Sequence, residues 1–227
     1  SRWYALAYGL NAGTLMGVRL DLTEPLAYSL AQAGVLLLLK KRSGWAAGAF
    51  ALAALTKEMT LMFAAGAVLA YAAQRDWRNA LKISTFVGLP FALWQLILFS
   101  WFGQFGVGSG GALATPFELV PLRGLWSIAA LDGRTFLLIA GLMLPLAVIP
   151  AAIGLWRSIG DARRRRFDLP MWLLLIHAAM IVVTPQSTFR EPLAMARFVV
   201  GLIAATLMYG AARRSKLEPI KKTALTL

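Results

Sequence analysis

Three long tracts without a charged side chain most constrain what this chain can fold into. They contain 20 to 22 residues each and run over Ile83–Phe102, Thr135–Trp156 and Leu169–Phe189. A helix of about 20 apolar residues crosses the roughly 30 Å hydrocarbon core of a bilayer. Only 15% of all residues are charged, whereas a soluble domain has about a quarter. The sequence therefore predicts an integral membrane protein.

Shorter apolar runs complete the predicted arrangement. Backbone polar groups must be satisfied internally in lipid, so we expect these segments to be helices. We predict an all-α polytopic bundle of about eight membrane helices, organised as a single transmembrane domain over residues 1–227. The chain enters an apolar run directly after Ser1, without a signal-peptide layout, so we interpret it as a fragment lacking N-terminal helices. The further runs are Trp3–Val18, Pro25–Leu39, Ser43–Thr56, Met59–Gln74 and Phe198–Ala212.

The positive-inside rule orders these helices. We expect Ser43–Gln74 to form a short helical hairpin with its tip at Lys57 and Glu58, which places Lys40–Arg42 and Arg75–Lys82 together on the inner side. The inner side then holds 17 Lys and Arg and 4 acids, and the outer side holds 6 of each. One long kinked helix over the same residues would separate the two basic loops. We therefore predict the hairpin, with the C-terminus on the cytoplasmic side of a bacterial inner membrane.

The net charge of +13 follows from this topology. The basic residues lie in several short loops, which favours contact with anionic lipid headgroups and argues against a nucleic-acid-binding face. The bilayer is the expected partner, and no nucleic acid is expected. The chain has no cysteine, which excludes disulfides and thiolate metal sites.

Four groups of polar residues reach the outer side in this topology. Ionisable residues at membrane depth are costly and mark functional sites. A local interpretation stays open for Glu24, because Asp21 or Thr23 could cap a helix that Pro25 begins. A solvated turn or an ion pair would likewise explain the hairpin tip. The groups are Arg19/Asp21/Glu24, Lys57/Glu58, the loop 103–134 and Arg190/Glu191/Arg197.

The outer loop 103–134 contains two patterns of its own. Gly106–Gly111 matches G-x-G-x-x-G, but no strand precedes it, so we interpret it as a flexible segment and not as a nucleotide site. Pro116–Ala130 is expected to form a short interfacial helix. His177 stands alone inside an apolar tract and is expected to be a hydrogen-bonded packing residue, not a metal ligand. The residues expected to dip into the membrane surface are Phe117, Leu119, Leu125 and Trp126.

One segment resembles a known family. Leu20–Gly66 reads LDLTEPLAYSLAQAGVLLLLKKRSGWAAGAFALAALTKEMTLMFAAG. Its Thr-Glu helix opening, basic turn and A-L-T-K-E element are similar to those of polytopic glycosyltransferases of the GT-C type. These include polyprenyl-phosphate-dependent and phosphatidylinositol-glycan mannosyltransferases and bacterial proteins of cell-surface glycopolymer formation. The stretch REPLAMARF, Arg190–Phe198, resembles the element before the final span of these enzymes.

The resemblance implies inverting transfer of a sugar from a polyprenyl-phosphate donor to a glycan or lipid acceptor on the outer, periplasmic face. A cationic site near the interface suits a lipid phosphate. Asp21 and Glu24 are the candidate catalytic carboxylates, and Glu58 and Glu191 are supporting acids. A divalent metal ion is a candidate cofactor with unknown ligands. The residues expected to bind the donor phosphate are Lys57, Arg190 and Arg197.

The resemblance also implies a catalytic aspartate in the first outer loop of the family, and no such loop precedes Trp3. Three interpretations stay open: the base lies upstream of Ser1, Asp21 replaces it, or the chain is not catalytic. Two other functions are consistent with the residues. One is a transporter or flippase for lipid-linked glycans, and the other is a non-catalytic membrane subunit of a glycan-assembly complex.

Overall fold

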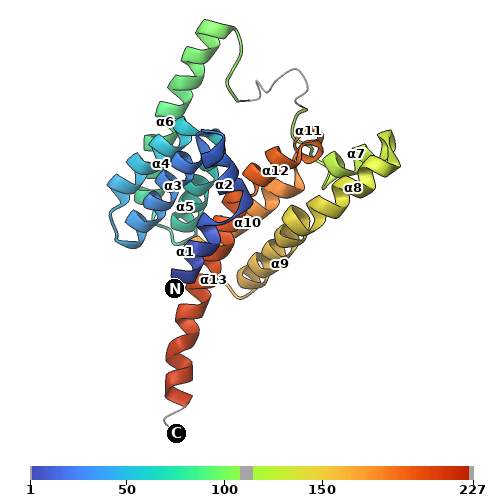
Figure 1. Cartoon of the computed structure of the whole chain (residues 1–227). Coiled ribbons are helices and arrows are strands. Elements are labelled where there is room, and N and C mark those ends of the chain that lie inside the picture. Colours follow the sequence, from blue (N-terminus) through green and yellow to red (C-terminus); the bar gives the residue numbers. More distant parts are fainter. Residues whose placement is uncertain (1, 108–114, 225–227) are drawn as a thin grey trace.

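The computed structural model describes residues 2–107 and 115–224, and these residues are helical without any strand (Figure 1). The expected all-helical class is confirmed for this part of the chain. The helices are α1 (Arg2–Gly9), α2 (Ala12–Arg19), α3 (Glu24–Leu39), α4 (Ser43–Thr56), η1 (Glu58–Thr60), α5 (Leu61–Ala73), α6 (Trp77–Phe102), α7 (Arg123–Leu131), α8 (Gly133–Met143), the π-helical turn η2 (Leu144–Val148), α9 (Ile149–Arg163), α10 (Leu169–Val182), α11 (Gln186–Arg190), α12 (Pro192–Phe198) and α13 (Val200–Ala224).

Three helical segments of the described chain are long and apolar enough to cross a membrane. They are Trp77–Phe102, Gly133–Arg163 and Pro192–Arg214, with 26, 31 and 23 residues. The first two coincide with predicted tracts. The third predicted tract, Leu169–Phe189, is not one helix, because α10 ends at Val182. Pro185 follows within three residues and disfavours helical backbone in the residue before it, which explains this end.

The first apolar run is also divided, contrary to the prediction. Trp3–Val18 forms α1 and α2, which are separated at Asn11. The Asn11 side-chain oxygen accepts a hydrogen bond from the Thr14 backbone N–H at 3.0 Å and thereby caps α2. Asparagine favours such a helix start over continuation of a helix, which explains the break. The described chain therefore contains three long helical segments, four apolar helices of 10 to 17 residues, and the two short helices α1 and α2.

The helical hairpin predicted for Ser43–Gln74 is present. Lys57 has an extended backbone, with φ −155° and ψ 118°, and separates α4 from η1 and α5. At the opposite end of the hairpin, the Lys82 ammonium group near the start of α6 donates a hydrogen bond to the Ser43 hydroxyl at the start of α4, at 3.2 Å. The chain therefore returns to the end from which α4 began, which a single long helix would not allow.

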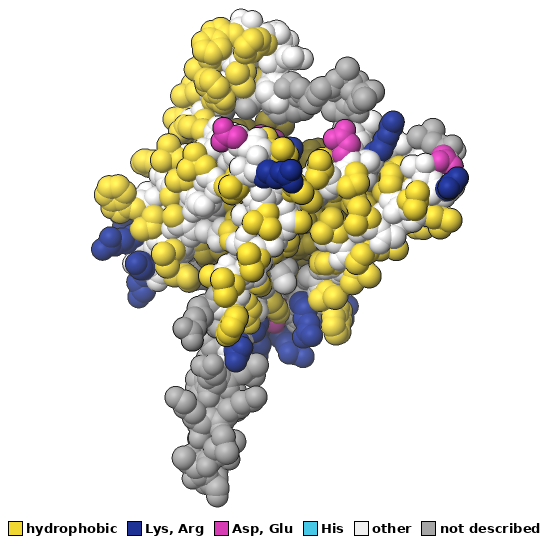
Figure 2. All heavy atoms as spheres, in the orientation of Figure 1, with side chains coloured by type: hydrophobic (Ala, Val, Ile, Leu, Met, Phe, Trp, Pro, Cys, Tyr) yellow, Lys and Arg dark blue, Asp and Glu magenta, His cyan; other side chains and the backbone are white. Residues whose placement is uncertain are grey.

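The loops at this end, named here the basic end, share one conformation. Helices α3, α5 and α9 finish with a Schellman motif, in which two backbone N–H groups bond the carbonyls three and five residues back, all at 2.9 Å. The residue with positive φ is a cation in each case, which complements the helix dipole. Figure 2 shows Lys and Arg side chains gathered along the lower border of the molecule. The three cations are Lys41, Arg75 and Arg165, with φ of 58°, 59° and 54°.

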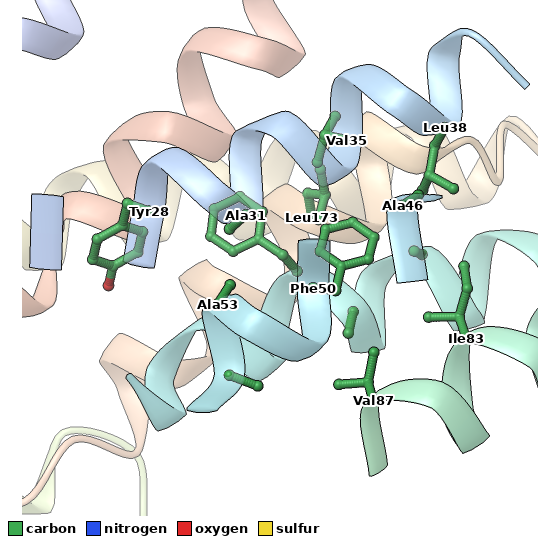
Figure 3. Packing of buried hydrophobic residues seen from close by; sticks show 14 of the residues in the cluster. Tyr28, Ala31, Val35, Leu38, Ala46, Phe50, Ala53, Ile83, Val87 and Leu173 are labelled. Atoms are coloured by element: carbon green, nitrogen blue, oxygen red, sulfur yellow. The ribbon is translucent and has the colours of Figure 1, made fainter. Parts of the chain in front are cut away.

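Helix α10 lies at the centre of the packing and belongs to two apolar clusters. Leu173 belongs to the same cluster as Phe50 of α4 and Ile83 of α6, and Figure 3 shows Leu173 beside Phe50. Leu174 packs with Met143 and Phe189 on the other side. Small residues let the helices approach closely, as is common where lipid provides no hydrophobic driving force between helices. The buried small residues of the first cluster include Ala31, Ala46, Ala47, Ala53, Ala54 and Ala67.

The hairpin geometry predicts the sidedness of three positions in the cysteine-free chain. Single cysteines at Lys40→Cys and Arg78→Cys should react with a membrane-impermeant maleimide from the same side of sealed vesicles. Glu58→Cys should react from the opposite side. Labelling of Lys40→Cys and Arg78→Cys from opposite sides would contradict the hairpin. The unsubstituted chain, which has no cysteine, is the control.

Candidate functional site

A buried carboxylate joins three helical elements at the end of the bundle opposite the basic end. Glu24 is the first residue of α3 and is only 4% exposed. The Arg197 Nε of α12 donates a hydrogen bond to Glu24 Oε1 at 3.0 Å, and Lys57 Nζ lies 3.7 Å from the same oxygen. A carboxylate taken out of water needs such partners to stay charged. Two cations from distant parts of the chain therefore share one anion.

A second carboxylate lies beside this group and has a different environment. Glu58 Oε1 is 3.9 Å from Lys57 Nζ. The Glu58 side chain is 46% exposed, whereas that of Glu24 is 5% exposed. Lys57 thus lies between one buried and one accessible carboxylate. The four side chains carry two positive and two negative formal charges.

The four charged side chains line a pocket of about 630 Å³. This volume is within the range of small-molecule sites, roughly 300–1,000 Å³. Aromatic rings of Tyr28, Phe117 and Phe198 and hydroxyl groups of Thr115, Ser187 and Thr188 complete much of the lining. The pocket therefore combines a charged wall with apolar and hydroxyl-bearing surfaces.

The end of α10 provides one wall of the pocket. Beyond Val182 the chain runs through Pro185 before α11 begins, and the outer loop is tied to this segment. The Glu118 N–H donates to the Val183 carbonyl at 3.0 Å. The Thr115 N–H donates to the Ser187 hydroxyl at 3.2 Å, and the Ser187 N–H donates to the Thr115 hydroxyl at 3.1 Å. These bonds fix the hydroxyl-bearing part of the pocket.

Close packing of α2 against α12 fixes the position of Arg197. A Cβ atom added at Gly13 would lie 2.1 Å from the Ala196 carbonyl oxygen. Since real Cβ atoms do not approach backbone this closely, only glycine permits this contact. Ala196 directly precedes Arg197, so the contact fixes the position of Arg197 along the axis of α2.

The structure brings Glu24, Lys57, Glu58 and Arg197 together but does not bring Asp21 to the pocket. Asp21 is exposed, has φ 50° and belongs to the turn that ends α2. Its N–H donates to the Val18 carbonyl at 3.3 Å. Thr23 makes no side-chain capping bond to α3. The predicted capping by Asp21 or Thr23 is therefore wrong, because the residues before α3 close the preceding helix.

Arg190 and Glu191 are also outside the pocket lining. Both are exposed where α11 meets α12. The neighbouring Phe189 is fully buried and contributes to the second apolar cluster. Burial of this ring turns the next residues toward the surface. Of these two arginines, it is Arg197, seven residues further along the chain, that contacts the carboxylate of Glu24.

The predicted interfacial helix is shorter than expected. The helix α7 begins only at Arg123. Leu125 is 3% exposed and packs in the second apolar cluster, so it does not face outward as predicted. Phe117, Leu119 and Trp126 are exposed, and their contact with a membrane surface stays a prediction. Residues 108–111 of the glycine-rich motif lie outside the described residues.

Sequence reasoning missed several pocket residues. Tyr28 lies one helical turn after Glu24, and this spacing on a helix is a signal that could have identified it. Thr115 lies in the outer loop, and Ser187 and Thr188 lie in the short helix α11; all three are uncharged, and no local pattern marks them. Their position depends on the backbone bonds between the outer loop and the end of α10.

A second ion-pair cluster, at the basic end, was also missed. Arg213 of α13 donates to Asp161 Oδ2 at 2.6 Å and to Asp168 Oδ2 at 2.7 Å. The Tyr209 hydroxyl donates to Asp161 Oδ2 at 2.7 Å. These bonds join α9, the start of α10 and α13. The charged groups of this cluster pair with one another, and the cluster holds these three helices together.

His177 behaves as predicted for a packing residue. It is 2% exposed, its Nδ1 is 2.8 Å from the Leu173 carbonyl oxygen, and its ring contacts Phe63 at a centroid distance of 4.5 Å. Among the described residues, no three acids or histidines gather in a way that could hold a metal ion. We therefore assign no metal ligands.

Comparisons of the chain with models of known protein families, with curated proteins and with solved structures found no match. The resemblance to the GT-C glycosyltransferases therefore stays a prediction from the sequence. Pocket geometry and membrane-type helices are the observations on which a functional proposal must depend.

The contact at Gly13 predicts a specific loss of stability. Gly13→Ala should lower the free energy of unfolding by about 1–3 kcal/mol, because the added methyl group forces α2 and α12 apart. Thermal unfolding in detergent measures this change. Gly88→Ala in α6 is the matched control, since a Cβ there meets nothing within 4 Å. Equal unfolding temperatures of the two variants would argue against the close contact.

Proposed function

We propose that this chain belongs to a GT-C-type membrane glycosyltransferase. In this proposal it binds a polyprenyl-phosphate sugar donor at the outer, periplasmic face of a bacterial inner membrane, for assembly of a cell-surface glycan or glycolipid. The observation that carries the proposal is the pair of cations, Lys57 and Arg197, held by one carboxylate, Glu24, in a pocket of about 630 Å³.

The two cations retain groups that suit a phosphate. Arg197 contacts Glu24 through Nε, and its two Nη groups make no hydrogen bond within the described residues. Lys57 Nζ lies at ion-pair distance, 3.7 and 3.9 Å, from its two carboxylates and keeps its three donor hydrogens. Charge-assisted hydrogen bonds from arginine and lysine are the usual means of binding phosphate oxygens. Arg190 is exposed outside the pocket and is left out of this assignment.

The lengths of the surrounding helices favour a ligand that is anchored in lipid. α3, α4, α5 and α10 contain 13 to 16 residues, which corresponds to about 20–24 Å at 1.5 Å per residue. The hydrocarbon core is roughly 30 Å thick. If their basic ends lie at the inner interface, their other ends lie below the outer surface. A phosphate linked to a lipid reaches that depth without leaving the bilayer.

Glu24 is assigned a positioning role in this proposal. Glu24 Oε1 is engaged by both Arg197 and Lys57, and the Glu24 side chain is only 5% exposed, so its contacts serve to hold the two cations in place. Asp21 lies outside the pocket lining. The described residues therefore account for donor binding, and we assign neither of these acids as the catalytic base.

Binding of undecaprenyl phosphate tests the proposal. Lys57→Ala and Arg197→Ala should each weaken binding to the purified protein in nanodiscs about tenfold or more, because each removes a charged partner of the phosphate. The binding can be followed by native mass spectrometry. Arg134→Ala is the matched control, since Arg134 is an exposed arginine outside the pocket.

Undecaprenol, which lacks the phosphate, distinguishes binding of the phosphate headgroup from binding of the polyprenyl tail. Its affinity should be the same in all variants. Unchanged binding of undecaprenyl phosphate in both Lys57→Ala and Arg197→Ala would overturn the proposed phosphate site.

A further inference from the structure

The two acids that line the pocket differ in what they can still bind. Glu24 Oε1 is engaged by Arg197 and Lys57, and its side chain is only 5% exposed. Glu58 has one ion-pair contact, at 3.9 Å, and its side chain is 46% exposed. No other acid with a described side chain lines this pocket. Glu58 therefore carries the carboxylate that a ligand in the pocket can reach.

The hairpin tip holds Glu58 in a defined place. The Lys57 carbonyl accepts hydrogen bonds from the Thr60 N–H at 3.0 Å and from the Thr60 hydroxyl at 2.8 Å. Thr60 is 1% exposed, so this turn is anchored in the interior. The backbone on both sides of Glu58 is thus fixed, and its carboxylate is presented at the pocket by a rigid element.

The arrangement of charges distinguishes the two ends of a glycosyl phosphate. A phosphate is attracted to Arg197 and Lys57 and repelled by the accessible carboxylate of Glu58. A sugar is uncharged and rich in hydroxyl donors, and an ionised carboxylate accepts several hydrogen bonds from such groups. The hydroxyl groups of Ser187 and Thr188 line the same pocket and add further polar contacts.

We propose that Glu58 binds hydroxyl groups of the transferred sugar, and that it orients the donor with the phosphate at Lys57 and Arg197. This inference rests on the proposed function, because it assigns the sugar-binding part of the same pocket. Glu58 is in this view a specificity-determining residue. It selects the glycosylated lipid over the bare carrier, because only the glycosylated lipid offers sugar hydroxyl groups and because the phosphate monoester of the carrier bears more negative charge than the phosphodiester.

Two classes of probe test this assignment. The first is undecaprenyl phosphate, and the second is a set of undecaprenyl-phosphate hexoses that includes the mannosyl and glucosyl lipids. Glu58→Gln should weaken binding of the glycosylated lipid that the unsubstituted protein prefers about tenfold, because the amide loses the charge-assisted bonds. Binding of undecaprenyl phosphate should stay equal or become tighter, since a repelling charge is removed.

Glu118→Gln is the matched control for the loss of one negative charge near the outer loop. Glu118 pairs with Arg123 at 3.8 Å and does not line the pocket. The affinities for undecaprenyl phosphate and for the glycosylated lipid should therefore both be unchanged. Glu58→Asp, which restores the charge, should recover part of the preference for the glycosylated lipid. Thermal unfolding of Glu58→Gln should match that of the unsubstituted protein.

The outcomes separate this inference from the proposed function. If the unsubstituted protein binds none of these lipids, the proposed function itself fails. If it binds undecaprenyl phosphate but prefers no hexosyl lipid over it, or if Glu58→Gln changes both affinities by the same factor, the assignment of Glu58 is wrong while the phosphate site stands.

Discussion

The buried carboxylate of Glu24 is the interaction on which the arrangement of the pocket depends. It joins the start of α3, the tip of the hairpin and α12, which are separated by up to 173 residues along the chain. An ionised acid that is 4% exposed is tolerated only while its two cations stay close. Conversely, Lys57 and Arg197 are held near each other, despite their like charge, because the shared anion lies between them.

The short central helix α10 gives the rest of the molecule its organisation. It contributes Leu173 to one apolar cluster and Leu174 to the other, so the α3–α6 part and the α7–α9 part pack on a common element. Its end at Val182 leaves the following residues free to pair with the outer loop. Pro185, Ser187 and Thr188, which follow this end, line the pocket.

Much of the architecture could be predicted from the sequence, because charge and hydropathy act along the chain. Uncharged tracts identified α6 and the α8–α9 segment, and the distribution of Lys and Arg identified the hairpin. The division at Asn11 and the end of α10 before Pro185 depend on single residues that break helices inside apolar runs. Asn11 and Pro185 are helix-breaking residues that the sequence displays, but the prediction followed the hydropathy of the surrounding runs.

The candidate site was predicted only in part. The topology placed Glu24, Lys57, Glu58 and Arg197 at one end of the bundle, and the structure brings them together. The predicted topology could not exclude Arg190 from the site, because the exposure of Arg190 follows from the burial of its neighbour Phe189. Contacts across long sequence separations, such as that of Thr115 with Ser187, leave no local pattern in the sequence.

The capped turns at the basic end bear on how the molecule can move. Each connection there is short and closed by backbone hydrogen bonds, and the Arg213 cluster locks α9, α10 and α13 together. Transporters that work by alternating access need a hinge or a gate at both faces of the membrane. The capped turns and the ion-pair cluster oppose such a hinge at the basic end, because they tie neighbouring helices to one another there.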